Sequence, residues 1–342
     1  MAMRAWGLAL ACLGAMGVWA CPTQTAAQDA AEFYRGKSVR VIVGFSSGGG
    51  YDQYARLFVR HAGRHTPGAP TYIVQSMPGA ASLKSVVYLE QGAPADGTAI
   101  VTFNPGLISQ SLTIPERVNV DFRRFAWIGN ISEDFRVCFM WGAKNIKTFD
   151  DVKAAKEIVF GTTGVGTSAY IEGRMLDEIF GVKLRQVQGY PGSADKRIAI
   201  ERGELDGDCG SWTSLPDDWV RDRRINLFVR FSRNLTADMP KDVVYAGSMI
   251  TDPEAKATYD LLMSGAEIGR PYIGPPTMPK DRVAALRAAF DATMKDPEFL
   301  ADAAKQRLEV NPQTGEEVAQ QLDAIYRTPA AAIKRARAIS GE

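Results

Sequence analysis

Short segments rich in β-branched residues alternate along the chain with segments of helical periodicity. The first of them, residues 39–45 (Val-Arg-Val-Ile-Val-Gly-Phe), predicts a buried strand. Glycines at positions 48–50 end it, and apolar residues then recur at helical spacing through residues 51–62. The same cycle recurs at residues 71–103 and across residues 158–231. This alternation predicts an α/β fold with mostly parallel sheets flanked by helices.

The length of 342 residues exceeds one average domain and suits two lobes, each with its own core. Beyond residue 250 the pattern becomes helical, with helix starts marked by prolines at positions 253 and 297 and by the capping box of Thr314 and Glu317. The apolar stripes of this tail need a partner surface, so we expect it to pack back on the first lobe. The expected division is lobe 1 at residues 28–134, lobe 2 at 135–240, and a return to lobe 1 with a helical tail at 241–342.

The N-terminus has the pattern of a secretory signal peptide, which we assign to residues 1–27. Arg4 precedes an uncharged apolar run at residues 6–18, and small residues follow it. A membrane-spanning helix needs about 20 apolar residues, and this run is shorter. Cleavage after Ala27 is favoured, with a lipid anchor at Cys21 as the alternative. Either site predicts export to the periplasm.

Charge and cysteine content exclude several classes of partner. The 40 basic and 39 acidic residues nearly cancel, whereas a nucleic-acid binder usually shows a basic excess, so no nucleic-acid partner is expected. A closed zinc site needs four ligands, and the chain has only His61 and His65 besides its cysteines, so no metal or other cofactor is expected. In an oxidising compartment Cys138 and Cys209 either form a disulfide or remain two buried thiols.

Three glycine-rich turns follow predicted strands, at residues 45–52, 161–168 and 189–193. In open α/β sheets ligands bind beyond the carboxyl ends of the strands, where helix N-termini offer free N–H groups that suit an anion. A glycine after a strand is also common in an ordinary tight turn. The Ser and Thr residues in the two longer turns add donors, which favours binding of a carboxylate between the lobes.

The glycine-rich turns also suggest two enzymatic interpretations. Gly44, Ser46 and Gly48 match the G-x-S-x-G elbow of hydrolases, but both histidines fall just after it, so a triad in that chain order cannot form. The glycines of the second turn have the spacing G-x-x-G-x-G, which is not the dinucleotide fingerprint. The carboxylates at residues 201–208 are assigned to a solvated helix end and the turn after it. The chain is therefore not expected to be an enzyme.

An ordered series of motifs resembles the solute receptors of tripartite tricarboxylate transporters, the Bug family. The series comprises residues 39–52, Met77-Pro78-Gly79-Ala80, 94–98, 164–167, 189–192, 203–207 and 275–279, and it spans nearly the whole mature chain. The resemblance implies a two-lobed fold like that of periplasmic binding proteins, a small carboxylate ligand, membrane permease subunits as partners, and a monomer. A periplasmic sensor that presents its ligand to a kinase is the alternative, with a serine hydrolase using Ser46 as a weaker one.

The same resemblance implies a set of binding residues from both lobes. Lobe 1 would contribute Ser46, Ser47, Gly48 and Gly49, lobe 2 would contribute Gly164, Gly166, Thr167 and Ser168, and Phe45 and Tyr190 would flank the ligand. Ser46 and Ser47 depart from the proline or alanine usual in the family, which leaves the ligand's identity open. Asp52 is expected to shape the first turn rather than contact the ligand. Trp212 is expected either in the cleft or in the core.

Overall fold

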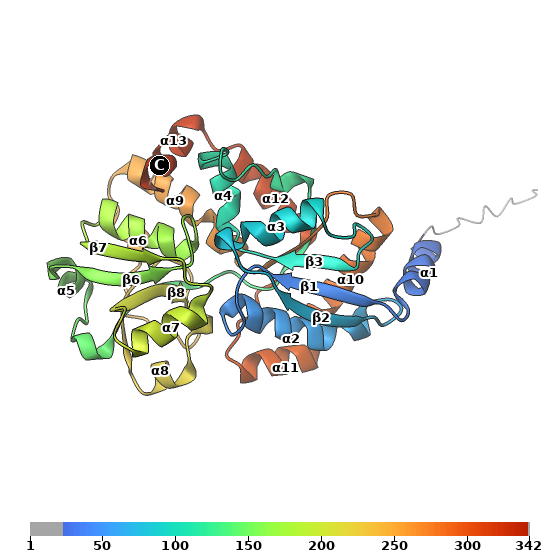
Figure 1. Ribbon diagram of the computed structural model, residues 1–342, viewed down its shortest axis with the longest axis horizontal. Coiled ribbons are helices and arrows are strands. Elements are labelled where there is room, and N and C mark those ends of the chain that lie inside the picture. The colour runs from blue at the N-terminus through green and yellow to red at the C-terminus, as the bar shows by residue number, and fades with distance from the viewer. Residues whose placement is uncertain (1–22, 341–342) are drawn as a thin grey trace, which may run out of the picture.

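A computed structural model describes residues 23–340, with side chains described from Asp29 onward (Figure 1). Most of the predicted signal peptide, including Cys21, therefore lies outside the described residues. Within the described part of the chain, no helix combines the length and apolar character needed to cross a membrane.

Lobe 1 is built on a six-stranded sheet with helices on both faces (Figure 1). Its strands are β1 (Ser38–Val43), β2 (Thr71–Ser76), β3 (Ala99–Thr102), β4 (Ala126–Asn130), β10 (Pro271–Gly274) and β11 (Gln313–Thr314), in the order β11-β4-β10-β3-β1-β2. Successive residues of β1 point to opposite faces, so Val41 and Val43 join one core cluster and Ile42 joins the other.

Each face of the lobe 1 sheet has its own helices. The cluster that contains Val41 also includes residues of α2 (Gly50–His65), α10 (Lys280–Met294) and α11 (Pro297–Lys305), and α1 (Thr23–Tyr34) contacts α10. The cluster that contains Ile42 includes residues of α3 (Leu83–Gln91), α4 (Gly106–Thr113) and α12 (Gly315–Tyr326). The capping box of Thr314 and Glu317 starts α12, as the sequence predicts.

Lobe 2 is built on a five-stranded sheet. Its strands are β5 (Arg136–Trp141), β6 (Ile158–Thr162), β7 (Leu184–Gln188), β8 (Gly207–Ser211) and β9 (Ile225–Arg230), in the order β7-β6-β8-β5-β9. One core cluster includes residues of α5 (Phe149–Ala154), α6 (Ser168–Glu178), α9 (Pro253–Ile268) and α13 (Ala330–Ile339). The other includes residues of α7 (Ser193–Glu201) and α8 (Asp217–Arg221).

The two-lobed α/β class is confirmed, but both sheets are mixed rather than mostly parallel. In lobe 1, β10 inserts between β3 and β4 and runs antiparallel to both. In lobe 2, β5 runs antiparallel to β8 and β9, whereas β6 is parallel to its two neighbours. Both β5 and β10 lie where the chain enters a lobe from the other one, so neither follows the strand-helix-strand connection that imposes parallel pairing; the two-residue β11 also pairs antiparallel with β4.

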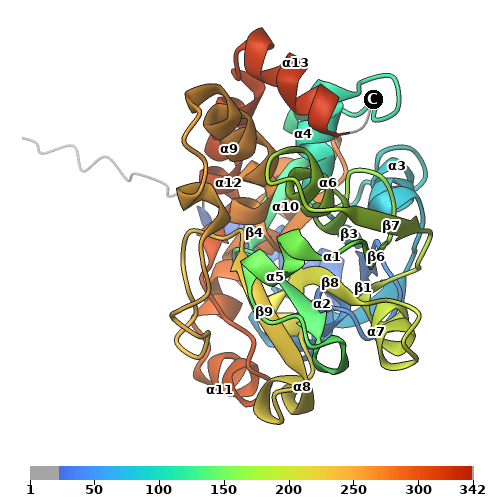
Figure 2. The same ribbon diagram turned by 90° about the vertical axis from the view of Figure 1, so that its left-hand side faces the viewer.

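The chain re-enters the lobe 1 sheet at Pro271, beyond the boundary at residue 241 that the sequence predicts. Helix α9, which lies between them, buries Tyr259, Leu262 and Met263 in the lobe 2 core. Helix α13 contacts α9, α4 and α6. Helices α9 and α13 lie side by side in Figures 1 and 2. The predicted return to lobe 1 therefore describes β10, α10, α11 and α12, while α9 and α13 cover lobe 2.

Candidate ligand-binding site

A cavity of about 60 Å³ lies between the lobes, at the ends of several helices. This is room for a few water-sized groups, at roughly 15 Å³ each. Lobe 1 contributes Phe45, Gly49, Gly50, Tyr51 and Asn104; lobe 2 contributes Arg136, Thr163, Thr167, Ser168, Ala169, Ser193, Lys196, Cys209 and Gly210; and Asp134 comes from the crossing between the lobes. A larger groove lies near β9 of lobe 2. The helix that begins at its wall, α5, is only six residues long.

Three helices begin at this cavity. Their N-cap residues are Gly49 for α2, Thr167 for α6 and Gly192 for α7, and no side chain caps any of the three. The first N–H groups of a helix have no partner within the helix, and the helix dipole places partial positive charge at the same end. Three such ends around one small cavity form a site for an anion, supplemented by the hydroxyls of Thr163, Ser168 and Ser193.

The first turn is fixed by a carboxylate behind it. Gly48 has a φ of +85°, in the left-handed region that favours glycine. Its N–H donates to Asp52 Oδ2 at 2.8 Å, and Arg56 Nε donates to the same oxygen at 2.8 Å. Asp52 is therefore engaged in shaping the turn, as expected, and the N–H groups that follow Gly48 remain free for a ligand.

The second turn is fixed by hydroxyls. Thr167 Oγ1 donates to the carbonyl of Gly164 at 2.9 Å and lies 3.0 Å from Thr162 Oγ1. Gly166 has a φ of +73°, and a Cβ at this position would lie 0.9 Å from Gln110 Nε2 of lobe 1. The backbone conformation thus favours glycine here, and any larger residue would also displace the Gln110 amide of the other lobe.

Direct contacts close the lobes on two sides of the cavity. On one side, Ser46 Oγ donates to Asp195 Oδ2 at 2.9 Å, and Arg197 Nη2 donates to the carbonyl of Gly48 at 2.6 Å. On the other side, Asn104 Nδ2 donates to the carbonyl of Gly166 at 3.4 Å, and Gln110 Nε2 donates to that of Val165 at 3.3 Å. The structure is therefore a closed arrangement of the two lobes.

The structure brings four of the predicted binding residues to the cavity wall: Phe45, Gly49, Thr167 and Ser168. The others lie beside it. Ser46, Gly48 and Gly166 make the contacts between lobes, the hydroxyl of Ser47 lies 3.2 Å from that of Ser76, Gly164 faces Ala81 across the lobes, and Tyr190 packs against the lobe 2 core.

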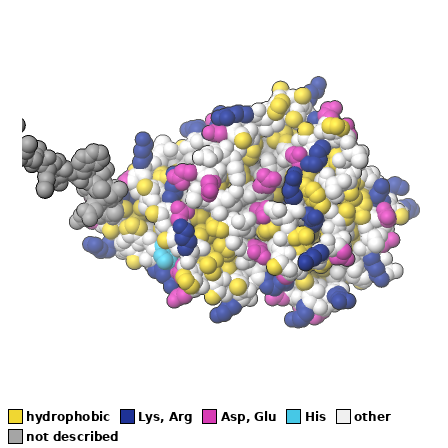
Figure 3. Space-filling view, turned by 180° about the vertical axis from the view of Figure 1, so that it is seen from behind, with side chains coloured by type: hydrophobic (Ala, Val, Ile, Leu, Met, Phe, Trp, Pro, Cys, Tyr) yellow, Lys and Arg dark blue, Asp and Glu magenta, His cyan; other side chains and the backbone are white. Residues whose placement is uncertain are grey.

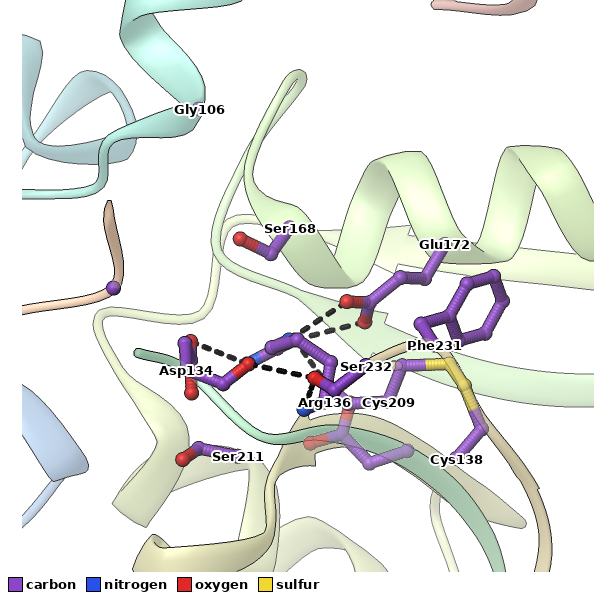
Figure 4. Close-up of polar contacts among 12 residues, drawn as sticks. Gly106, Asp134, Arg136, Cys138, Ser168, Glu172, Cys209, Ser211, Phe231 and Ser232 are labelled. Atoms are coloured by element: carbon purple, nitrogen blue, oxygen red, sulfur yellow. Dashed lines mark hydrogen bonds and ion pairs between the residues drawn. A yellow bond between two sulfur atoms is a disulfide. The ribbon is translucent and has the colours of Figure 1, made fainter. Parts of the chain in front are cut away.

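Buried charged residues at the cavity are a feature that the sequence interpretation missed. Arg136 bonds both oxygens of Glu172, at 2.7 and 2.8 Å, and donates to Asp134 Oδ2 at 3.2 Å (Figure 4). Arg270 of lobe 1 donates to both oxygens of the same Asp134, at 3.2 and 2.9 Å. Asp134, Arg136, Glu172 and Arg270 thus form an ion network that joins the lobes behind the cavity.

The pKa values of the two carboxyls in this network shift in opposite directions. Burial raises the pKa of Glu172 to about 7, against the opposing effect of Arg136. Burial also acts to raise the pKa of Asp134, but the guanidinium groups of Arg270 and Arg136 outweigh it and leave that pKa lowered. Asp134 is therefore the firmly ionised member of the network, and Glu172 is the member that titrates near neutrality.

A second buried ion pair borders the cavity. Lys196 Nζ lies 2.6 Å from the carboxylate of Asp208, and both side chains are buried. Asp208 does not belong to a solvated helix end, as the sequence interpretation had it; it lies within β8, where its neighbours bury it. A charged residue inside an otherwise apolar strand, such as Arg136 in Arg-Val-Cys-Phe-Met-Trp, is the sequence signal that points to such sites.

Cys138 and Cys209 are directly opposite each other on β5 and β8 and form a disulfide. Glu172 lies close to both sulfur atoms, but a disulfide offers no thiolate to a metal ion. Of the two expectations for Trp212, the core is correct: the side chain is 2% exposed, and its Nε1 donates to Asp238 at 2.9 Å.

The residues of the elbow motif have other partners. The hydroxyl of Ser46 is bonded to Asp195. His61 and His65 extend from α2 toward α11, where they bond Asp302 and Asp296 at 3.0 and 2.8 Å. Lys and Arg side chains are interspersed with Asp and Glu on the molecular face in Figure 3, as the near-zero net charge predicts.

Comparison with known proteins identifies the fold. No protein-family model matches the chain. The periplasmic binding protein BugD shares the fold with a TM-score of 0.73 at 20% identity, over 87% of this chain and 96% of BugD. MatC from Rhodopseudomonas palustris, solved with bound malate, does so with a TM-score of 0.70 at 16% identity, over 89% of this chain and 99% of MatC. The fold is thus that of a periplasmic binding protein.

A curated relative supports the resemblance within this class. A UPF0065 protein of Agrobacterium vitis, from the TAR-I ttuE-ttuC' intergenic region, is 26% identical over 200 residues. The alignment covers 56% of this chain and spans 55% of the relative's length. Together with the likeness to BugD, it confirms the resemblance to the Bug solute receptors that the motifs predict.

Proposed function

We propose that this protein is a periplasmic solute-binding protein that captures a small carboxylate between its lobes and delivers it to the permease subunits of a tripartite tricarboxylate-type transporter. The observation that supports this most directly is the convergence of three uncapped helix N-termini on one cavity between two lobes. The malate bound to MatC, which has the same fold, is consistent with an acid as ligand.

The mechanism follows from the placement of these helix ends on different lobes. When the lobes are apart, the end of α2 is separated from the ends of α6 and α7, so a carboxylate meets the donors of one lobe only. Closure adds the donors of the other lobe, and the ligand therefore favours the closed form. A change from mostly open to mostly closed requires a preference of about 5 kcal/mol, which several hydrogen bonds to a charged group, at ~1.5–3 kcal/mol each, can supply.

The binding function is tested by isothermal titration of the mature protein with acetate, malate and citrate. Malate is the first probe because MatC was solved with it. We expect at least one of the three acids to bind. Glycerol, which has hydroxyl groups but no carboxylate, should give no heat of binding. Failure of all three acids in folded protein would contradict the proposal.

Gly49→Val tests the role of the first turn. Its side chain would occupy the space between the α2 terminus and Ser193, whose nearest atoms lie 3.7–3.9 Å from the position of a Cβ. We expect binding to weaken roughly 100-fold, because two or so hydrogen bonds to the carboxylate are lost. Thr71→Val, at the exposed start of β2 and away from the turn, is the matched control and should bind as the parent does.

Closure is tested by solution scattering with and without the acid that binds. We expect a smaller radius of gyration in the complex, because the segments that cross between the lobes, from β4 to β5, from α9 to β10 and from α12 to α13, act as hinges. An unchanged radius with tight binding would place the site on a single lobe, and the residues assigned from the other lobe would then be withdrawn.

A further inference from the structure

Arg136 belongs both to the cavity wall and to the buried ion network. Its Nε and Nη2 donate to Glu172, Nη2 also lies 3.5 Å from the carbonyl oxygen of Cys209, and Nη1 donates to Asp134, so the second N–H of Nη1 can serve a ligand in the cavity that Arg136 lines. Figure 4 shows the guanidinium between these two carboxylates, with Ser168 of the α6 terminus above it. Arg136 and the α6 terminus line the same cavity, so an anion held by that terminus would lie next to the guanidinium.

The buried charges around Arg136 already balance one another. Three cationic groups face three carboxylates: Arg136, Arg270 and Lys196 on one side, and Asp134, Glu172 and Asp208 on the other. All six side chains are buried. With Glu172 ionised, each carboxylate group of a bound acid adds one negative charge to this balanced set, and an uncompensated charge in such surroundings is costly. Uptake of one proton by a neighbouring carboxylate offsets one such charge.

Glu172 is the group placed to take that proton. It is 0% exposed and faces Arg136 of β5, Asp134 of the crossing segment, Asp208 of β8, Tyr259 of α9 and the sulfur atoms of the disulfide. Only Arg136 among these holds it by hydrogen bonds. A ligand that draws on Arg136 weakens this hold and adds a like charge, and both effects favour protonated Glu172, whose pKa is already raised by burial to about 7.

We propose that Arg136 is a ligand-binding residue that divides its guanidinium between the bound acid and Glu172, so that binding draws a proton onto Glu172. This inference rests on the proposed function and adds a proton as a second, obligatory ligand. The direction of the pH dependence follows from the coupling between acid binding and proton uptake. Below pH ~7 Glu172 is protonated before the acid arrives, and affinity is flat; above it a proton must be taken up, and affinity falls as the pH rises.

The test is titration of the mature protein with malate, acetate and citrate at pH 8 in phosphate and in Tris, which differ in ionisation enthalpy. For the acid that binds, we expect the apparent binding enthalpies in the two buffers to differ. Their difference, divided by the difference between the buffers' ionisation enthalpies, should give an uptake of close to one proton. We also expect the dissociation constant to rise three- to tenfold between pH 7.5 and pH 8.5, the slope of about tenfold per pH unit being the limit for one proton.

Glu172→Gln separates this role from a merely structural one. It keeps a group of the same shape but cannot titrate, so affinity should become independent of pH and the enthalpies in the two buffers should agree. Glu178→Gln, the same change at an exposed position on α6, should retain the proton uptake of the parent. If Glu172→Gln does not fold, the titration of the unaltered protein in the two buffers still shows whether binding takes up a proton.

The outcomes distinguish this inference from the function on which it rests. If none of the three acids binds, the proposed function fails and this inference fails with it. If an acid binds with equal enthalpies in both buffers and an unchanged dissociation constant, the function stands and the inference is overturned. Proton uptake that persists in Glu172→Gln would assign the proton to another carboxylate and would also overturn it.

Discussion

The buried side chains in the central strands of lobe 1 are uncharged, whereas strands of lobe 2 contain buried charge where they reach the cavity. In β1 and β3 the buried side chains are mainly Val and Ile. In β5 and β8, Arg136 and Asp208 are buried beside the disulfide of Cys138 and Cys209. Burial of charge gives little net stability, so lobe 2 relies more on its covalent bond. Backbone strain is more concentrated in lobe 1, where the consecutive residues Ala80, Ala81 and Ser82 all have positive φ, than in lobe 2, where the isolated Asn145 and Arg223 do.

Removal of the disulfide should give the largest effect. The cysteines are 71 residues apart, so Cys138→Ala with Cys209→Ala should lower the free energy of unfolding by about 4 kcal/mol in the chain-entropy model. Urea denaturation, monitored through a spectroscopic signal from lobe 2, measures this loss in the free energy of unfolding. Reductant should shift the parent protein and leave the double variant unmoved; two free thiols in unfolded, unreduced parent protein would show that no disulfide forms.

Separation of a buried ion pair should come next. Lys196→Met leaves Asp208 buried without its cation and should cost roughly 3 kcal/mol at pH 8. Burial raises the pKa of Asp208 even in the parent, with Lys196 opposing that shift, so the variant raises this pKa further. An acid whose pKa is raised on folding loses stability as the pH rises through its folded pKa. The denaturation midpoints of the variant should therefore approach those of the parent as the pH is lowered toward 4. A loss of stability that does not depend on pH would contradict this explanation.

Relief of strain in lobe 1 should give the smallest effect, and one of opposite sign. Ala80 is exposed with a φ of +46°, so Ala80→Gly should raise the free energy of unfolding by about 1 kcal/mol. The same change at Ala288, exposed within α10, should lower it by about 1 kcal/mol. Equal and negative effects at both positions would show that residue 80 is not strained and would remove this contrast between the lobes.

The sequence predicts local features of this molecule well. The strands, the glycine turns, the role of Asp52 and the helix starts at residues 253, 297 and 315 follow from periodicity and capping chemistry, which act over a few residues. The antiparallel insertion of β10 between β3 and β4 does not, because it pairs segments far apart in the chain. The same is true of Arg136 with Glu172: each charge looks solvated until folding places the two together.

The position of β10 in the sheet order also determines the sequence of events in folding. Because β10 lies between β3 and β4, the first four strands of lobe 1 cannot form one continuous sheet until residues 271–274 are present. The lobe 2 sheet, in contrast, uses strands from one uninterrupted stretch between Arg136 and Arg230. Pairings between distant segments form slowly, and domains fold as their strands become available. As the chain emerges with its N-terminus first, lobe 1 therefore stays incomplete until most of the chain has emerged. The lobe 2 sheet can form earlier, and lobe 1 is then completed against it.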